Sequence, residues 1–203
     1  MLRITVRVVI AAALLWLAIH YWPWRTIRHA PGILVKSDPL QTSLSAMTLP
    51  SIKNYQIEAV ALYDITARVL GTKHYWAGPG SDLVPRDVAV AWGRMSDQTV
   101  LDQLAISQSN RFYFYEWRSQ PPIPRDEIIA HSANMHLIAA NSRVASAIGR
   151  LQAGTVVTMH GYLVNVSTAD GFHWRTSLTR TDSGNGACEL MYVEDVKECP
   201  TEF

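Results

Sequence analysis

Cysteine is scarce in this chain of 203 residues, which contains only Cys188 and Cys199. Two thiols allow at most one disulfide within the chain, and in an oxidising compartment these two could pair. The ten residues between them, ELMYVEDVKE, are typical of a strand, and an extended strand holds the two sulfur atoms far apart. A disulfide therefore requires a tight turn near Glu194 and Asp195, and both alternatives stay open at this point.

An excess of basic charge is also lacking, since 18 basic and 17 acidic residues leave a formal net charge of +1. Four of the arginines precede residue 29, whereas all the acidic residues follow it, so the rest of the chain has 14 basic against 17 acidic residues. A balance of about −3 lacks the electrostatic footprint of a nucleic-acid-binding domain. We therefore expect no nucleic acid among the partners.

Metal-binding motifs are absent too, because neither H-E-x-x-H, H-x-H nor C-x-x-C occurs. His131 and His136 lie five residues apart and are the only weak candidates for metal ligands. A metal site needs two or three converging ligands, usually with a carboxylate. We therefore expect no metal ion and no cofactor.

Charged residues are missing altogether from residues 8–24, VVIAAALLWLAIHYWPW. As a helix, these seventeen residues would span about 25 Å, slightly less than the hydrocarbon core of a bilayer. Arginines flank the stretch on both sides and aromatic residues cluster at its end, as at a membrane interface. The pattern predicts a transmembrane anchor over residues 8–24 after a tail of residues 1–7, with the N-terminus inside. The residues expected at the interface are Arg3, Arg7, Tyr21, Trp22, Trp24 and Arg25.

Two other interpretations of this stretch fit less well. A cleaved signal peptide would need small residues at the cleavage site, but the bulky IHYWPW follows the apolar core. A helix of the folded domain would show an amphipathic stripe, and this stretch is apolar on every face. An uncleaved signal anchor in a lipid bilayer is the favoured interpretation.

The rest of the chain divides into a linker over residues 25–54, rich in proline, serine and threonine, and one domain over residues 55–203. Alternating apolar residues predict a long strand over residues 55–70. The aromatic run RFYFYEW at residues 111–117 predicts a strand that is buried on both faces.

Helix signals are interspersed with these strands. Ser96 is a plausible N-cap, Pro124 precedes two acidic residues, and Asn141 precedes apolar residues at helical spacing. The order of elements predicts an α+β fold with one mainly antiparallel β domain and two or three short helices. The helix over residues 142–152 and the strands that follow resemble the latter half of an OB-like barrel, over about fifty residues.

Catalytic residues are suggested only weakly. A nucleophilic thiolate needs a nearby histidine, and Cys188 could meet His160 or His173 across the predicted strands. The alternative is that Cys188 is a small buried side chain at the start of a strand. This hypothesis corresponds to an envelope hydrolase.

Ligand contacts are suggested by arginine and aromatic residues. Arg175 and Arg180 could hold an anion or a carboxylate. Trp76 and Trp92 are candidate contact residues if they lie on the surface, where such rings stack on sugars or anchor an interface.

Three segments together resemble a group of membrane-anchored bacterial proteins for which no activity is known. They are PRDVAVAWGRMSD (residues 85–97), SANMHLI (residues 132–138) and SLTRTDSGNGACE (residues 177–189). The resemblance implies a bacterial inner-membrane protein with a periplasmic domain and no assigned function. Without a convergent catalytic motif, we expect a binding or scaffold domain, not an enzyme, whose partner is another envelope protein or an envelope glycan. The alternatives are the Cys188 hydrolase and an OB-like binder of oligosaccharide or nucleic acid.

Overall fold

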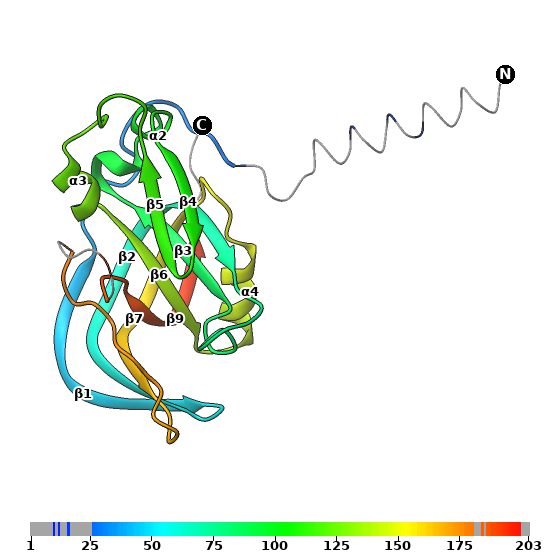
Figure 1. Ribbon diagram of the computed structural model, residues 1–203, viewed down its shortest axis with the longest axis vertical. Coiled ribbons are helices and arrows are strands. Elements are labelled where there is room, and N and C mark those ends of the chain that lie inside the picture. The colour runs from blue at the N-terminus through cyan, green and yellow to red at the C-terminus, as the bar shows by residue number, and fades with distance from the viewer. Residues whose placement is uncertain are drawn as a thin grey trace.

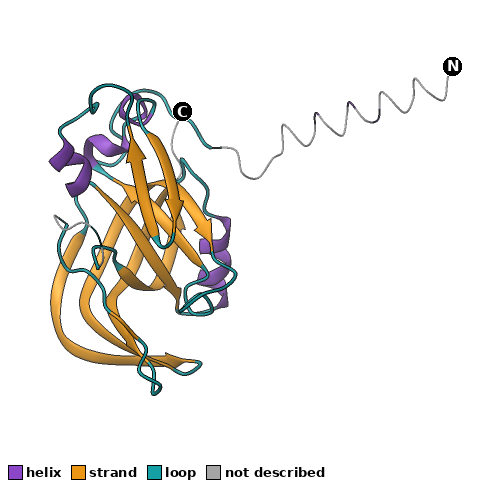
Figure 2. Ribbon diagram, viewed as in Figure 1, coloured by secondary structure: helices purple, strands orange, loops and turns teal. Residues whose placement is uncertain are grey.

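The structure is a computed structural model that describes Ile10, Ala12, Trp16 and residues 26–180, 184 and 186–199. In this part of the chain strands predominate and the helices are short (Figure 1 and Figure 2). The strands are β1 (Leu40–Ile52), β2 (Tyr55–His74), β3 (Arg86–Ala91), β4 (Ala105–Ser109), β5 (Phe112–Glu116), β6 (Ser132–Ala139), β7 (Val156–Ser167), β8 (His173–Trp174) and β9 (Leu190–Glu198). The helices are the 3-10 helix η1 (Gly93–Ser96), α2 (Gln98–Leu101), α3 (Arg125–Ala130) and α4 (Ser142–Arg150).

Five strands close into a barrel because the long strand β2 pairs with β3 along one edge and with β7 along the other. The order around the barrel is β2, β3, β6, β9, β7 and back to β2 (Figure 1). Neighbouring strands are antiparallel except for the parallel pair β6 and β9. β1 extends the sheet beyond β2, and β8 pairs with the end of β7. The chain thus contains the mainly antiparallel β domain that the sequence predicts.

The position of α4, between the third barrel strand β6 and the fourth barrel strand β7, completes the topology. A five-stranded Greek-key barrel with this arrangement has the architecture of an OB-fold. In such barrels ligands bind on the face of the second and third strands, between the loop after the first strand and the loop after the fourth. Here that face belongs to β3 and β6, and the two connections are residues 75–85 and residues 168–189.

The alternation of side chains along β2 builds the core. Ile57, Ala59, Ala61, Tyr63 and Ile65 are each at most 1% exposed, whereas the residues between them remain accessible. A strand has a side-chain period of two, so this pattern gives β2 one buried and one outward face. The strand predicted over residues 55–70 is therefore present, and it extends to residue 74.

Residues 26–39, which we call the strap, lie against the domain. The Ile27 N–H donates to the Ala153 carbonyl (2.8 Å), and the Val35 N–H donates to the Ser96 hydroxyl (3.0 Å). The next thirteen residues form β1. The segment predicted to be a linker therefore contributes a docked strap and a strand, because the strand's backbone finds a partner in β2 that local composition does not reveal.

The structure corrects the predicted membrane anchor. Most of residues 8–24 and all six predicted interface residues lie outside the described residues. Within the described residues, no helix has the length and apolar character needed to cross a bilayer. The longest, α4, has nine residues, whereas a span of about 30 Å needs about 20. The predicted transmembrane helix, and the inner-membrane location with a periplasmic domain that depends on it, are contradicted by this finding.

The aromatic strand is also different from the prediction. β5 pairs with β4 in a separate two-stranded sheet instead of lying inside the main sheet. Tyr113 and Tyr115 are partly buried, but Phe114 on the other face is 46% exposed. The prediction of burial on both faces is wrong because aromatic content indicates a strand without indicating how many layers cover it.

Local signals at the helices are mostly confirmed. The Asn141 side chain accepts a hydrogen bond from the Val144 N–H (3.0 Å) and caps α4 as predicted. The N-cap of α2 is Asp97, which accepts from the Thr99 N–H (2.8 Å), whereas the predicted cap Ser96 ends η1.

The two cysteines form no disulfide. β9 runs as a strand through Glu194 and Asp195, so the tight turn that a disulfide would require is absent from this described segment.

Candidate binding cleft

A cleft of about 610 Å³ opens beside β6, between the loop of residues 75–85 and the connection from β7 to β9. Its volume lies within the range of about 300–1,000 Å³ that is typical of small-ligand sites. The position matches the face on which OB-type barrels bind their ligands. The lining combines aromatic rings with basic and imidazole groups, chiefly Phe112, Phe172, Trp174, Arg111, His136 and Arg175.

A buried carboxylate organises the polar floor of the cleft. Asp87 on β3 lies directly opposite His136 on β6 in the strand register, and its side chain is fully buried. Asp87 Oδ1 accepts hydrogen bonds from Arg111 Nη1 (2.8 Å) and His136 Nδ1 (2.9 Å). Because the carboxylate can only accept, the imidazole carries a proton on Nδ1. Burying a charged carboxylate is unfavourable without such partners, so the three side chains form one unit.

Aromatic rings hold Arg111 in place. Its guanidinium lies 4.0 Å from the ring centroid of Tyr75 and 5.4 Å from that of Trp174. It also donates to the Val84 carbonyl (3.0 Å), and its backbone N–H donates to the Tyr75 hydroxyl (2.9 Å). Burial raises the pKa of Tyr75, so this hydroxyl stays neutral over the physiological range. Arg111 is therefore a structural part of the wall, with its charge compensated by Asp87.

Trp174 forms the boundary between the two loops. Its ring centroid lies 4.7 Å from that of His136. Gly80 approaches it so closely that a Cβ atom there would lie 2.9 Å from the indole, and the φ angle of Gly80 is +69°. Glycine alone meets both requirements without strain. The loop of residues 75–85 can therefore close over the tryptophan only because residue 80 has no side chain.

The rim of the cleft carries an accessible positive charge. His173 and Arg175 are both exposed and both line the cleft. Arg175 forms no ion pair with any described residue. The rim thus carries an exposed guanidinium, and the contact of Arg175 with an anion stays a prediction.

Cys188 lines the same cleft as His136 and His173. Its sulfur lies 3.6 Å from the Arg111 carbonyl oxygen and 4.0 Å from Asn134 Nδ2. Both contacts hold the Cys188 side chain in the wall of the cleft.

The other predicted catalytic and metal-binding histidines lie apart. His160 Nδ1 on β7 bonds Asp64 Oδ1 (2.5 Å) on β2, and His160 does not line the cleft. His131 follows α3 and contacts the Glu127 carbonyl (3.1 Å). Among the residues that the structure describes, no three His, Cys, Asp or Glu side chains come together as they would around a metal ion.

The remaining predicted contact residues divide into one surface residue and two structural ones. Trp76 is 87% exposed, and its ring lies tilted against that of His74 with 3.9 Å between the ring centroids. Trp92 is fully buried, and its Nε1 donates to Asp38 (2.9 Å) on the strap. Arg180 donates to the Pro39 carbonyl (2.6 Å), which makes it a contact between the strap and the connection from β7 to β9. Neither Trp92 nor Arg180 lines the cleft.

Sequence reasoning missed Asp87, Arg111 and Phe112 as site residues. A signal was present for Asp87, because an acidic residue directly before the apolar strand VAVAW needs a partner when the strand is buried. Arg111 lies in the turn between β4 and β5 and Phe112 begins β5, and no local pattern connects these residues with β6.

Comparison with known proteins adds no family: no family model, no curated protein and no solved structure matches this chain. The resemblance to a group of bacterial proteins therefore stays a prediction.

Proposed function

We propose that this domain binds an acidic oligosaccharide in the cleft, with Arg175 holding a carboxylate of the ligand. The observation that carries the proposal is an exposed guanidinium, without an ion-pair partner among the described residues, beside the rings of Phe172 and Trp174. Aromatic faces stack on sugar rings, and a guanidinium binds a carboxylate through charge-assisted hydrogen bonds. The proposal narrows the predicted partner, an envelope protein or a glycan, to a glycan.

Charge favours a glycan over a nucleic acid. The other cleft arginine, Arg111, is already paired with Asp87. A single-stranded nucleic acid carries a phosphate at every nucleotide, and proteins follow it with a positively charged groove. A net charge of about −3 outside the N-terminal segment and one available guanidinium do not provide such a groove.

Binding, not catalysis, is the activity that the cleft supports. The cleft thiol is held as a hydrogen-bond donor, and the cleft imidazole is fixed by a buried carboxylate. Both groups contribute to the walls of the cleft. The Cys188 hydrolase stays the alternative prediction.

The experiment is calorimetric titration of the protein with uronic-acid disaccharides, with their methyl esters and with oligo-dT. We expect the acids to bind and Arg175→Gln to weaken that binding about tenfold or more, because a hydrogen bond to a charged group contributes about 1.5–3 kcal/mol. Binding of the uncharged methyl esters should not respond to Arg175→Gln.

Arg125→Gln is the matched control, because Arg125 is an exposed arginine on α3 away from the cleft. It should leave every affinity unchanged. The proposal fails if no uronic-acid disaccharide binds at millimolar concentration, if both variants behave alike, or if oligo-dT binds more tightly than the sugars.

A further inference from the structure

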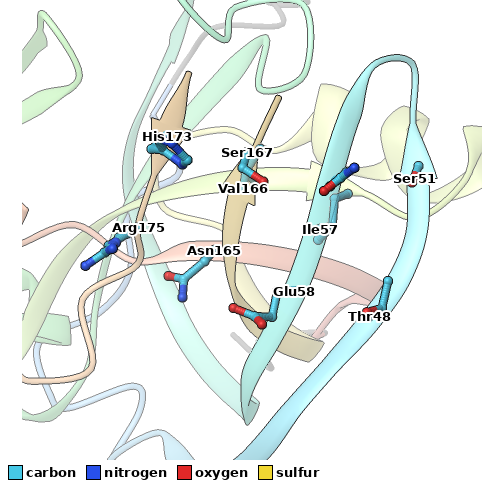
Figure 3. Close-up of a pocket in the computed structure, with 10 residues that line it drawn as sticks. Thr48, Ser51, Ile57, Glu58, Asn165, Val166, Ser167, His173 and Arg175 are labelled. Carbon is cyan, nitrogen blue, oxygen red and sulfur yellow. The ribbon is translucent and has the colours of Figure 1, made fainter. Parts of the chain in front are cut away.

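A second cavity, of about 560 Å³, is lined by residues of β1, β2 and β7 and shares His173 and Arg175 with the cleft (Figure 3). Its base is the outward face of the sheet formed by β1, β2, β7 and β8. The side chains labelled in Figure 3 from these four segments surround one open space. No residue of β3 or β6, the strands beside the cleft, lines this second cavity.

Strand register arranges the polar side chains of this face in two rows. Thr48 pairs with Glu58, and Glu58 pairs with Asn165 on the next strand. Asn165 Oδ1 accepts from the Thr176 N–H (3.3 Å), which places neighbouring Arg175 at the end of this row.

The second row runs parallel to the first. Gln56 pairs with Ser167, and Ser167 pairs with His173, while Ser51 lines the cavity at the β1 end. We call the two rows the platform; its members are Thr48, Ser51, Gln56, Glu58, Asn165, Ser167, His173 and Arg175.

The platform has its hydrogen-bonding capacity available. Apart from Asn165, no platform side chain makes a hydrogen bond or ion pair with another described residue, and none is fully buried. Hydroxyl, amide, carboxylate and guanidinium groups alternate, so donors and acceptors are interleaved. Glu58 and Arg175 lie at a separation of two strand spacings, about 10 Å. A surface that is rich in both donors and acceptors suits the hydroxyl groups of uncharged sugars.

The platform and the cleft are continuous because His173 and Arg175 line both. The four strands of the platform span about 14 Å at their usual spacing, which is longer than a single sugar ring. If the ligand is a chain of sugars with its acidic unit in the cleft, its next units therefore extend over residues 173–175 onto the platform.

We propose that the platform is a second binding subsite, which holds uncharged sugar units next to the acidic unit in the cleft, so that the ligand is an extended glycan. This inference rests on the proposed function of the cleft. It assigns the chain length of the ligand and places the specificity for neutral units on β1, β2 and β7.

The experiment compares a uronic-acid disaccharide with a hexasaccharide that has the same acidic terminal unit followed by neutral hexoses. We expect the hexasaccharide to bind about tenfold or more tightly. The double substitution Gln56→Ala and Glu58→Ala should remove that gain, since two net hydrogen bonds correspond to about tenfold or more in affinity. It should leave the disaccharide affinity unchanged. Gln103→Ala, at an exposed glutamine that lines neither cavity, is the matched control.

The two proposals fail in different ways. Equal affinities for the two sugars, or a double variant that keeps the full gain, overturn the platform and leave the cleft. Binding of the hexasaccharide that depends on Gln56 and Glu58, together with no disaccharide binding, overturns the cleft and supports the platform. Binding of neither sugar overturns both.

Discussion

At the scale of single residues, Asp87 shows how one buried charge can hold several elements together. It lies on β3, and its partners lie on β6 and at the turn between β4 and β5. The charge is tolerated in the interior because His136 and Arg111 satisfy one carboxylate oxygen. Removing one member of such a network leaves the others buried without compensation, which costs more than the network contributes when it is complete.

Asp87→Asn should therefore lower the free energy of unfolding by about 3 kcal/mol, measured by urea denaturation. Asp195→Asn is the matched control, because Asp195 is partly exposed and pairs with the exposed side chains of Arg143 and Lys197. An exposed pair contributes at most about 1 kcal/mol. Equal losses in the two variants would contradict a special role for the buried carboxylate.

Tyr55 gives a pH-dependent prediction. Its hydroxyl donates to Asp82 Oδ1 (2.7 Å), and this hydrogen bond, with burial, raises the pKa of Tyr55 to about 12. The folded protein holds the phenol proton more tightly than the unfolded chain does. The contribution to stability is therefore fully present below about pH 10, the ordinary tyrosine value, and it is lost as the pH rises toward 12.

We expect the wild type to be more stable than Tyr55→Phe by roughly 1–2 kcal/mol at about pH 9. The expected difference is no larger because Asp82 is half exposed, so solvent partly screens its interaction with Tyr55. The difference should shrink at about pH 11.5, as measured by urea denaturation of both proteins. Groups that titrate in both proteins cancel in this comparison. A difference that does not change with pH would contradict the assignment.

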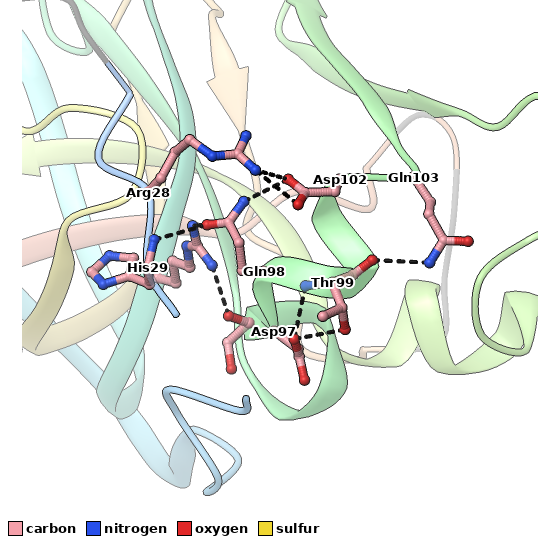
Figure 4. A network of polar contacts seen from close by, with 9 residues as sticks. Arg28, His29, Asp97, Gln98, Thr99, Asp102 and Gln103 are labelled. Carbon is pink, nitrogen blue, oxygen red and sulfur yellow. Dashed lines mark hydrogen bonds and ion pairs between the residues drawn. The ribbon is translucent and has the colours of Figure 1, made fainter. Parts of the chain in front are cut away.

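At the scale of elements, the strap is attached to the barrel through a network centred on Gln98 (Figure 4). Gln98 Oε1 accepts from the His29 N–H (3.1 Å) and also from Arg68, whose guanidinium donates to the Ser96 carbonyl (3.0 Å). Arg68 is only 1% exposed, and burial lowers its pKa to about 10. Arg28 adds two hydrogen bonds to Asp102 at the end of α2. The strap therefore helps to hold in place the glutamine that accepts a hydrogen bond from a buried cation.

The strap also requires a glycine beneath it. A Cβ atom on Gly154 would lie 2.0 Å from the Ile27 carbonyl oxygen, and the φ angle of Gly154 is +95°. We expect Gly154→Ala to destabilise the protein by about 2–3 kcal/mol, through backbone strain and displacement of the strap. Amide hydrogen exchange at Ile27 and His29 should become faster.

Gly149→Ala is the matched control for this substitution. Gly149 lies in α4, and its Cβ atom would meet no other atom within 4 Å. The variant should therefore be unchanged or stabilised by up to about 1 kcal/mol. If both alanine variants were equally stable, the strap would not be seated on residue 154.

At the scale of the whole molecule, closure of the barrel depends on the last strand. β9 pairs with β6 on one side and with β7 on the other, and Val193 is in register with a residue on each. β1, in contrast, pairs only with β2, and its register is irregular between Ser43 and Met47. The same substitution should therefore have different consequences in the two strands.

Val193→Pro should abolish cooperative thermal unfolding, as followed by circular dichroism, because proline removes a donor from the middle of a closed sheet. Ser45→Pro lies in the irregular part of the outer strand and should cost about 1 kcal/mol or less. A cooperative transition near the wild-type temperature in Val193→Pro would mean that the barrel does not depend on β9 for closure.

The candidate site could be predicted only in part. Arg175 and Cys188 stood out as single residues, and both lie in the cleft. Arg111 and Asp87 did not stand out, because their contact joins β3 to a turn residue 24 positions further along the chain. A pattern of residues that are neighbours in the sequence carries no information about such a contact. Arg180 shows the converse, since a plausible ligand residue is instead used to hold the strap.

Local interactions determined what the sequence by itself could specify. The alternation along β2 and the cap at Asn141 depend on neighbours within a few residues, so the strand and α4 follow directly from the chain. Only the tertiary structure decided which strands pair, that β6 and β9 run parallel, and that residues 40–52 are an outer strand. Those outcomes depend on backbone groups and side chains that become neighbours after the chain has folded. The tertiary structure also decided the cleft and the platform, since each is assembled from segments that meet only when the barrel closes.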